Sequence, residues 1–361
     1  MFDSLPTGAL LGIFVIAAGA IWWAGTRLSD ATDILSKRFG FGEALGGVIL
    51  LAVATNLPEI AITVSAALTG NLGVATGNIL GGIAIQTVVL VALDRFGTPS
   101  ESPLTYKAEN LTPVIEGLLV IAVLIVAIMG TQLPASLIAA RVAPGGLLIF
   151  ILWVIGIRLI SRANKGLPWR NRNGDAPHPQ GVSKEQLQKD HGTVAVEKGA
   201  TTTRTTTRTV IVFLIAAVVT LVAGVVLERA GERIAGHFGM SGVLFGSTVL
   251  AAATSLPELS TGLAATKLGD YQLAMSDIFG GNAFLPVLFL PATLISGKAI
   301  LPQAQSTDIY LAGLGVLLTS IYLGGLIFRS KRRVLGMGID SLAVLVLYIA
   351  GTAGLFVIAK S

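Results

Sequence analysis

Long apolar runs recur along almost the whole chain. A helix needs about 20 apolar residues to cross a bilayer, and ten runs are long enough to be candidates. Because these runs are continuous and do not alternate with polar residues, they predict helices rather than the strands of a membrane barrel. The expected spans are Gly8–Gly25, Ala44–Ala67, Val74–Leu93, Leu111–Met129 and Pro144–Ile160, followed by Val210–Leu227, Val243–Ala265, Tyr271–Leu294, Ile309–Phe328 and Leu342–Ala359.

The composition points to the same class. Charged residues make up 12% of the chain, against about 25% in an ordinary soluble domain. The absence of cysteine excludes disulfide bonds and Cys-ligated zinc or iron–sulfur sites. We therefore predict an all-α polytopic membrane protein.

Polar residues concentrate in one segment, residues 161–208, which divides the expected spans into two sets of five. It holds too few apolar residues to bury a core of its own. It is either a flexible loop or a small regulatory module. The predicted organisation is a first five-helix unit over 1–160, a polar loop over 161–208 and a second five-helix unit over 209–361.

The basic residues predict an orientation. With ten spans, the loops alternate between two sides, and one side, counting Arg158 at the end of the fifth span, holds 20 of the 25 Lys and Arg residues. Cytoplasmic loops carry the excess of positive charge, so this side is expected to be cytoplasmic. The 161–208 loop then faces the cytoplasm and both termini face outside, in a cell or inner membrane. The net charge of +5 is thereby explained without a nucleic-acid partner.

The two units share an internal repeat. Phe39–Glu59 and Phe238–Glu258 align without gaps at an offset of 199 residues, with 11 of 21 positions identical. Both copies contain the pattern A-T-[NS]-L-P-E inside an expected span. Five spans separate the copies, and an odd number inverts the second copy in the membrane. The sequence therefore predicts two inverted five-helix repeats with broken helices two and seven, as in secondary transporters.

Each copy places a proline and a glutamate in the middle of a span, Pro58-Glu59 and Pro257-Glu258. Proline frees a backbone carbonyl, here near Thr55 or Thr254. A carboxylate at mid-bilayer costs several kcal/mol unless it faces a partner. A kinking proline or a lone protonated glutamate could be structural, but two pairs at equivalent positions favour a site for calcium, sodium or protons.

Spans three and eight add glycines and further polar residues. The small residues could serve helix packing alone. Asn78 and Gln86 lie in one span, and Asp277 and Asn282 in the other. Asp277 is a third candidate intramembrane acid. Glu116, Asp308 and Asp340 are expected at span ends, in the membrane interface.

With these residues in view, the chain resembles the cation/calcium exchanger superfamily, in particular prokaryotic sodium/calcium antiporters. The specific part is a repeated G-T-S-L-P-E motif followed by G-S-N. Here the motifs read Ala54-Thr55-Asn56-Leu57-Pro58-Glu59 with Gly81-Gly82-Ile83, and Ala253-Thr254-Ser255-Leu256-Pro257-Glu258 with Gly280-Gly281-Asn282.

The resemblance implies that the two glutamates bind calcium, share sodium sites and are completed by neighbouring hydroxyls. The residues it implicates directly are Glu59, Glu258, Thr55, Thr254 and Ser255, with Asn56 at a position where the family usually has serine. From the sequence pattern we add Asp277, Asn78, Gln86 and Asn282 as candidate ligands.

The chain also departs from the family pattern. Gly82 and Gly281 replace the serines of G-S-N, and Ile83 replaces one asparagine. The polar position three residues further on is Gln86 in one copy but Leu285 in the other. Several hydroxyl and amide groups that outline sodium sites are therefore missing, while both glutamates are kept.

The first hypothesis is an antiporter that exchanges calcium for sodium by alternating access. The second keeps the fold and couples calcium, or another cation, to protons. The third is a membrane enzyme, or a scaffold or assembly factor that does not transport; the absence of catalytic motifs argues against an enzyme. No cofactor is expected, because the ions are substrates, and the expected partners are these ions and the lipid bilayer, with no obligatory protein partner.

Overall fold

The computed structural model describes residues 5–39, 47–98, 102–164, 200–240 and 242–359. Most of the polar segment and both chain ends lie outside these ranges, so their expected places remain predictions. The helices are α1 (Thr7–Phe39), α2 (Gly47–Thr55), α3 (Leu57–Thr69), α4 (Leu72–Ala92), α5 (Leu104–Lys107), α6 (Thr112–Thr131), α7 (Pro144–Asn164), α9 (Ala200–His237), α10 (Gly242–Phe245), α11 (Ala251–Thr254), α12 (Leu256–Lys267), α13 (Tyr271–Phe284), α14 (Phe289–Ser296), α15 (Ser306–Phe328) and α16 (Ile339–Ile358).

Short irregular elements join these helices. α4 continues into a π-helical turn, Leu93–Gly97, and another π turn, Gly246–Leu250, joins α10 to α11. A 3₁₀ turn, Leu285–Leu288, joins α13 to α14. Another 3₁₀ turn spans Leu301–Gln303, and the strands β1 (Arg333–Val334) and β2 (Met337–Gly338) form a small hairpin.

The described residues contain eight helices long and apolar enough to cross a membrane. They correspond to all the expected spans except the second and the seventh. Those two are the interrupted helices α2–α3 and α10–α12. The all-α membrane class is therefore confirmed, and the count of ten spans stays a prediction with which the eight continuous and two interrupted helices agree.

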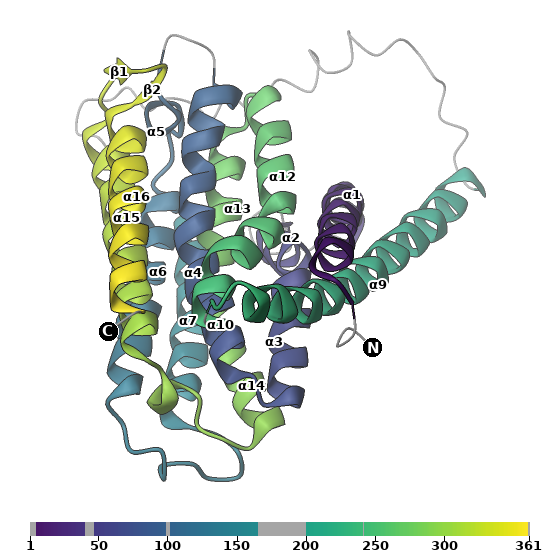
Figure 1. The fold of residues 1–361 in the computed structure, drawn as a ribbon. Coiled ribbons are helices and arrows are strands. Elements are labelled where there is room, and N and C mark those ends of the chain that lie inside the picture. Colours follow the sequence, from purple (N-terminus) through teal and green to yellow (C-terminus); the bar gives the residue numbers. More distant parts are fainter. Residues whose placement is uncertain (1–4, 40–46, 99–101, 165–199, 241, 360–361) are drawn as a thin grey trace, which may run out of the picture.

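The helices form an upright bundle with α4 and α13 inside it (Figure 1). In the most apolar window of Leu72–Gly97, 83% of residues are buried, and in that of Tyr271–Ser296, 72%. The outer helices α7 and α9 reach only 28%. Their exposed apolar side chains are what a lipid-facing surface requires. The polar residues of α4 and α13 are thereby held at the centre of the molecule.

The contacts between helices follow the repeat. α3 packs on α9 while α12 packs on α1, and α4 packs on α15 while α13 packs on α6. Each pair becomes the other when the two five-helix units are exchanged. α1 and α9 also pack against each other, and α9 runs obliquely along one side of the bundle (Figure 1).

Two equivalent glycines seat α1 and α9 on the breaks of the opposite repeat. A Cβ atom added at Gly25 of α1 would lie 2.6 Å from Cβ of Pro257. One added at Gly224 of α9 would lie 3.1 Å from the carbonyl oxygen of Pro58. The two glycines are 199 residues apart, so the repeat offset pairs them as well. Each long helix thus lies in backbone contact with the proline that interrupts a helix of the other unit.

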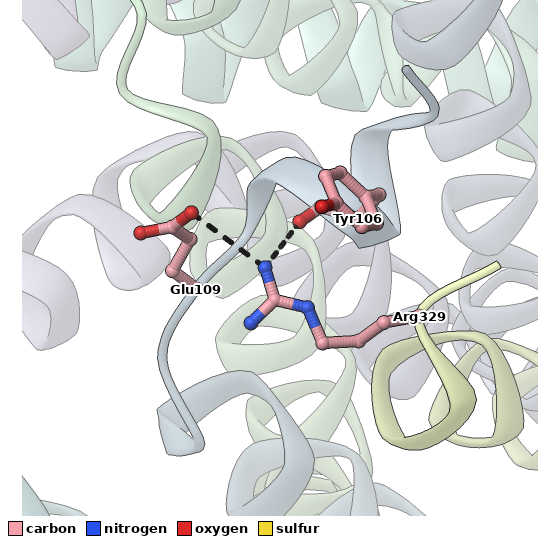
Figure 2. A network of polar contacts seen from close by, with 3 residues as sticks. All are labelled: Tyr106, Glu109 and Arg329. Atoms are coloured by element: carbon pink, nitrogen blue, oxygen red, sulfur yellow. Dashed lines mark hydrogen bonds and ion pairs between the residues drawn. The ribbon is translucent and has the colours of Figure 1, made fainter. Parts of the chain in front are cut away.

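Polar contacts tie the connections at one end of the bundle. The buried Asp94 accepts hydrogen bonds from the backbone N–H of Leu104 at 2.8 Å and of Gly338 at 2.6 Å. Arg329, after α15, donates to the carbonyl of Tyr106 at 2.6 Å and lies 3.6 Å from Glu109 (Figure 2). The Arg329–Glu109 pair is exposed and is worth at most about 1 kcal/mol, whereas Asp94 satisfies buried backbone groups.

Candidate functional site

The second and seventh helices break directly after the threonine that both copies of the repeat share. Asn56 separates α2 from α3 with φ −86° and ψ 13°, and Ser255 separates α11 from α12 with φ −80° and ψ 4°. Both following helices carry proline in their first two positions. Proline lacks the N–H that a continuous helix needs, so the breaks expected from the sequence are confirmed.

Glu59 and Glu258 lie in the first turns of α3 and α12 and are 0% exposed. The N-terminal turn of a helix presents free N–H groups and the positive end of the helix dipole, which favours a carboxylate there. Each glutamate is also held by its own backbone N–H. The break therefore supplies a local reason why a carboxylate is tolerated at this depth.

The two repeats exchange hydroxyl groups across the site. Thr254, from the second repeat, lies beside the carboxylate of Glu59. Thr55, from the first repeat, lies beside the carboxylate of Glu258. The two glutamates are close enough for their charges to interact. Each repeat thus contributes an acid to one half of the site and a hydroxyl to the other half.

Gln86 of α4 lies between the two carboxylates. Its Nε2 is 3.4 Å from Oε1 of Glu59, 3.5 Å from Oε1 of Glu258 and 3.3 Å from Oδ1 of Asn56. These distances are long for hydrogen bonds, so no single acceptor holds the amide tightly. Gln86 therefore marks the point at which both repeats meet.

Buried oxygen atoms at this centre lack partners. Oε2 of Glu59, Oε2 of Glu258 and Oε1 of Gln86 have no hydrogen bond. Within the described ranges, no ion pair reaches either glutamate. An unpaired carboxylate in an apolar interior is costly, because neither water nor a counter-charge compensates it. The centre consequently has unsatisfied capacity for a positively charged or hydrogen-bonding ligand.

The residues that depart from the family pattern fit one another. A Cβ atom at Gly281 would lie 2.8 Å from Nδ2 of Asn56, so the asparagine fills the space that a serine at 281 would take. On the opposite side, a Cβ atom at Gly82 would lie 3.3 Å from Cδ1 of Leu285. The side that holds Asn56 and Gln86 is polar, and the side that holds Leu285 is apolar.

Four expected site residues lie away from this central contact. Asn282 donates to Oγ1 of Thr87 at 3.2 Å, and both polar side-chain atoms of buried Asn78 lack partners. The Ser255 hydroxyl donates to the Ala251 carbonyl at 2.8 Å. Asp277 accepts a 2.6 Å bond from Thr261 of α12, although its charge still acts on Glu258.

Two other acids that were expected at span ends are buried inside the protein. Glu116 and Asp308 are 1% and 2% exposed, so neither side chain faces the surface, and their depth in the membrane interface stays a prediction. Glu116 lies one turn into α6, beside Ser276 on α13, and neither of its carboxylate oxygens has a hydrogen bond. Asp308 caps α15 by accepting from the N–H of Gln305 at 2.8 Å. A side chain near the end of a span can still be buried when a neighbouring helix covers it.

Sequence reasoning missed two more buried acids, Asp94, described above, and Glu228. Glu228 of α9 is 1% exposed and accepts a hydrogen bond from Ser65 of α3 at 3.1 Å. It falls one residue beyond the expected span and its repeat equivalent is Ser29, so neither hydropathy nor the repeat marks it. In the described part of the chain, no three His, Cys, Asp or Glu residues cluster as metal ligands do. The centre is a two-carboxylate site with amide and hydroxyl neighbours.

A family comparison decides what kind of protein carries this site. The sequence profile described as "Sodium/calcium exchanger protein" matches residues 9–161 and 208–357. The chain belongs to this family. It is therefore a multi-pass membrane antiporter of the cation/calcium exchanger type and not an enzyme.

Curated relatives match over most of their lengths. The chain is 25% identical to the "Inner membrane protein YrbG" of Escherichia coli K12 over 304 residues, which cover 82% of this chain and 83% of that protein. It is 26% identical to the "Putative antiporter CaxA" of Alkalimonas amylolytica over 312 residues, covering 84% and 87%.

Solved structures of two exchangers share the fold. The sodium–calcium exchanger NCX_Mj aligns with a TM-score of 0.60 at 17% identity and covers 96% of this chain and 99% of its own. The H⁺/Ca²⁺ exchanger CAX aligns with a TM-score of 0.66 at 16% identity and covers 97% and 85%. One fold thus accommodates two different coupling ions, and the fold alone does not choose between them.

Proposed function

We propose that this protein exchanges calcium for sodium across the cell membrane, with Glu59 and Glu258 as the central cation ligands. The observation that carries the proposal is the pair of fully buried, facing carboxylates with one free oxygen each. The family match, to the profile described as a sodium/calcium exchanger, supports sodium as the counter-ion. No cofactor enters the proposal, because both ions are substrates.

A cation is the ligand that this centre can hold most favourably. Two negative charges in an apolar interior repel each other and are poorly solvated. The described residues bring no Lys or Arg into an ion pair with them. A bound cation supplies the missing positive charge and occupies the unpartnered oxygens. Binding an anion or a neutral solute would leave that charge uncompensated.

The donor set suits a hard cation. Calcium takes about six to eight oxygen ligands, from carboxylates, carbonyls, amides and water. The centre offers both glutamates, Thr55 and Thr254 beside them, and the amides of Asn56 and Gln86. Oxygen donors of this kind discriminate against soft metals, which prefer sulfur.

The same charges would couple the two ion movements. With the site empty, neither carboxylate has a counter-charge, and a closed, dry intermediate is then expensive. The protein should therefore change its facing only when calcium, sodium or protons occupy the site. This restriction converts alternating access into exchange. In the proposed orientation, the polar loop faces the cytoplasm and both termini face outside.

Calcium uptake into proteoliposomes tests the proposal. The purified full-length protein is given an outward sodium gradient at clamped pH, or an outward proton gradient without sodium. Glu59→Gln and Glu258→Gln keep the side-chain shape and remove the charge, and each should lower sodium-driven uptake at least tenfold. Glu109→Gln is the matched control, because Glu109 is exposed at the surface and should leave uptake unchanged.

Proton coupling is the second candidate, and a specific observation favours it. Leu285 takes the place equivalent to Gln86, and Gly82 provides no hydroxyl, so oxygen ligands for several sodium ions are fewer on that side. Two carboxylates can carry two protons in place of one calcium ion. Uptake driven only by the proton gradient would replace sodium with protons in the proposal.

A non-transporting scaffold predicts a third outcome. In that case no gradient would drive calcium or another cation, and the two glutamine variants would behave like the parent protein. Flux that survives in both glutamine variants would likewise refute the assignment of Glu59 and Glu258 as ligands.

A further inference from the structure

Two cavities have lining residues that correspond in part under the repeat, and they lie toward opposite ends of the molecule. The first, which we call the α1 cavity, measures about 450 Å³ and is lined by Ser29, Asp30, Thr261 and Asp277 among others. The second, the α9 cavity, measures about 360 Å³. Ser29 in the first corresponds to Glu228 in the second at the 199-residue offset.

The packing of α12 on α4 places the two cavities at opposite ends. A Cβ atom at Gly97, at the end of α4 and its π turn, would meet Thr266 near the end of α12. The α1 cavity includes Leu268, just beyond Thr266. The α9 cavity includes Asn71, just before α4 begins. The helix Leu72–Gly97 runs between these two points and has 26 residues, a length of about 39 Å. The two cavities are therefore separated by about the length of this helix.

A buried acid closes the inner end of the α1 cavity. Asp277 is 2% exposed, and its Oδ2 accepts the Thr261 hydroxyl at 2.6 Å. Its Oδ1 has no partner. Thr261 lies three residues after Glu258 on α12, and the charge of Asp277 acts on Glu258. The cavity therefore reaches from the surface to a carboxylate that adjoins the central pair.

The lining of this cavity favours a positive ion. Asp30 is exposed at its border, and Ser29 and Thr261 add hydroxyl groups. Carboxylates that line a concave surface concentrate cations and speed their arrival. The α9 cavity also holds acids, Glu232 and the buried Glu228, but the positive charge of Arg229 acts on Glu228 together with the negative charge of Glu232. Among the residues that the structure describes, no Lys or Arg charge acts on Asp277 in this way.

We propose that Asp277, with Thr261, binds a hard cation at the inner end of the α1 cavity, as a site separate from Glu59 and Glu258. Calcium or sodium would occupy it on the way between this face and the central pair. The proposal rests on the exchange function proposed above. It adds a second binding position that is reached from one side only.

The absence of cysteine makes this site testable by single-cysteine labelling. Ser29→Cys places one thiol in the wall of the α1 cavity without altering Asp277 or Thr261. Gly236→Cys is the matched reporter in the α9 cavity, where an added Cβ meets no atom within 4 Å. Both full-length variants are placed in proteoliposomes, and a cationic, membrane-impermeant methanethiosulfonate measures the rate of labelling.

Calcium added on the side of the α1 cavity should slow labelling of Ser29→Cys. Asp277→Asn should raise the calcium concentration needed for this effect at least tenfold, and Thr261→Val should raise it less. Glu258→Gln should leave the effect in place. Labelling of Gly236→Cys should not respond to Asp277→Asn, which controls for a general change in folding.

Three results would overturn the separate site. The first is that calcium leaves Ser29→Cys labelling unchanged in the parent background. The second is that the calcium effect persists in Asp277→Asn, and the third is that it vanishes in Glu258→Gln. Loss of calcium flux with labelling still slowed by calcium would instead refute the exchange function and keep the Asp277 site.

Discussion

Replacing Gly281 by serine tests how Asn56 and Gly281 share one space. The new Cβ atom would lie 2.8 Å from Nδ2 of Asn56, closer than real Cβ contacts. Overpacking of this kind costs about 1–3 kcal/mol. A shift of Asn56 would also break its 2.7 Å hydrogen bond to the Ala52 carbonyl, worth about 0.5–1.5 kcal/mol. Together these terms predict a loss of about 1.5–4.5 kcal/mol for Gly281→Ser.

Shortening Asn56 should relieve most of that loss. In Asn56→Ser/Gly281→Ser, the two small side chains restore the family arrangement and the close contact disappears. The double variant should therefore be more stable than the sum of the single variants by about 1 kcal/mol or more. Reversible unfolding of the purified protein in detergent measures all four forms. Calcium affinity, measured on the same samples, shows whether the centre is retained.

Gly82→Ser is the matched control for this cycle. Its Cβ atom would meet only the end of the Leu285 side chain at 3.3 Å, and that methyl group can move. The cost should stay below about 1 kcal/mol and should not change when Asn56 becomes serine. Strict additivity of Asn56→Ser and Gly281→Ser would refute the shared-space account.

Three other substitutions probe packing and buried charge. Gly25→Ala would place Cβ 2.6 Å from Pro257 and should destabilise the protein by about 1–3 kcal/mol. Gly19→Ala, on the same helix, meets open space and should stabilise it by up to about 1 kcal/mol. Equal shifts of the unfolding temperature in the two variants would contradict this account. Asp94→Asn should lower the stability of the protein by about 1–3 kcal/mol, because it leaves one of two buried N–H groups without an acceptor. Proteolysis should therefore be faster, and an unchanged rate would argue against Asp94 as the acceptor of both groups. Glu116→Gln should raise the unfolding temperature, because both carboxylate oxygens lack partners, and a lower temperature would mean that the acid has a ligand.

Local rules explain what could be predicted from the sequence. Proline cannot continue a helix, so Pro58 and Pro257 predict the breaks wherever the surrounding chain folds. The repeat then indicates that both breaks belong to one centre, and the structure does bring Glu59, Glu258 and Gln86 together. These inferences needed only spacing and residue type.

The rest depends on how the repeats interlock. Nothing local predicts that Thr254 lies beside Glu59, because the two residues come from different units. The burial of Glu116 comes from α13, which packs over it, and not from its own helix. Glu228 was missed because its repeat equivalent is a serine, so comparing the two repeat copies, which identifies the central acids, gives no signal at this position.

The unequal sides of the centre have an energetic consequence. Two identical inverted repeats that exchanged conformations would produce inward-facing and outward-facing states of equal energy. Only the positions at which the repeats differ can favour one resting state. At the centre these include Gln86, whose repeat equivalent is Leu285, and Asn56, whose repeat equivalent is Ser255. Whether the empty protein favours the inward-facing or the outward-facing state is therefore determined by the residues at which its two repeats differ.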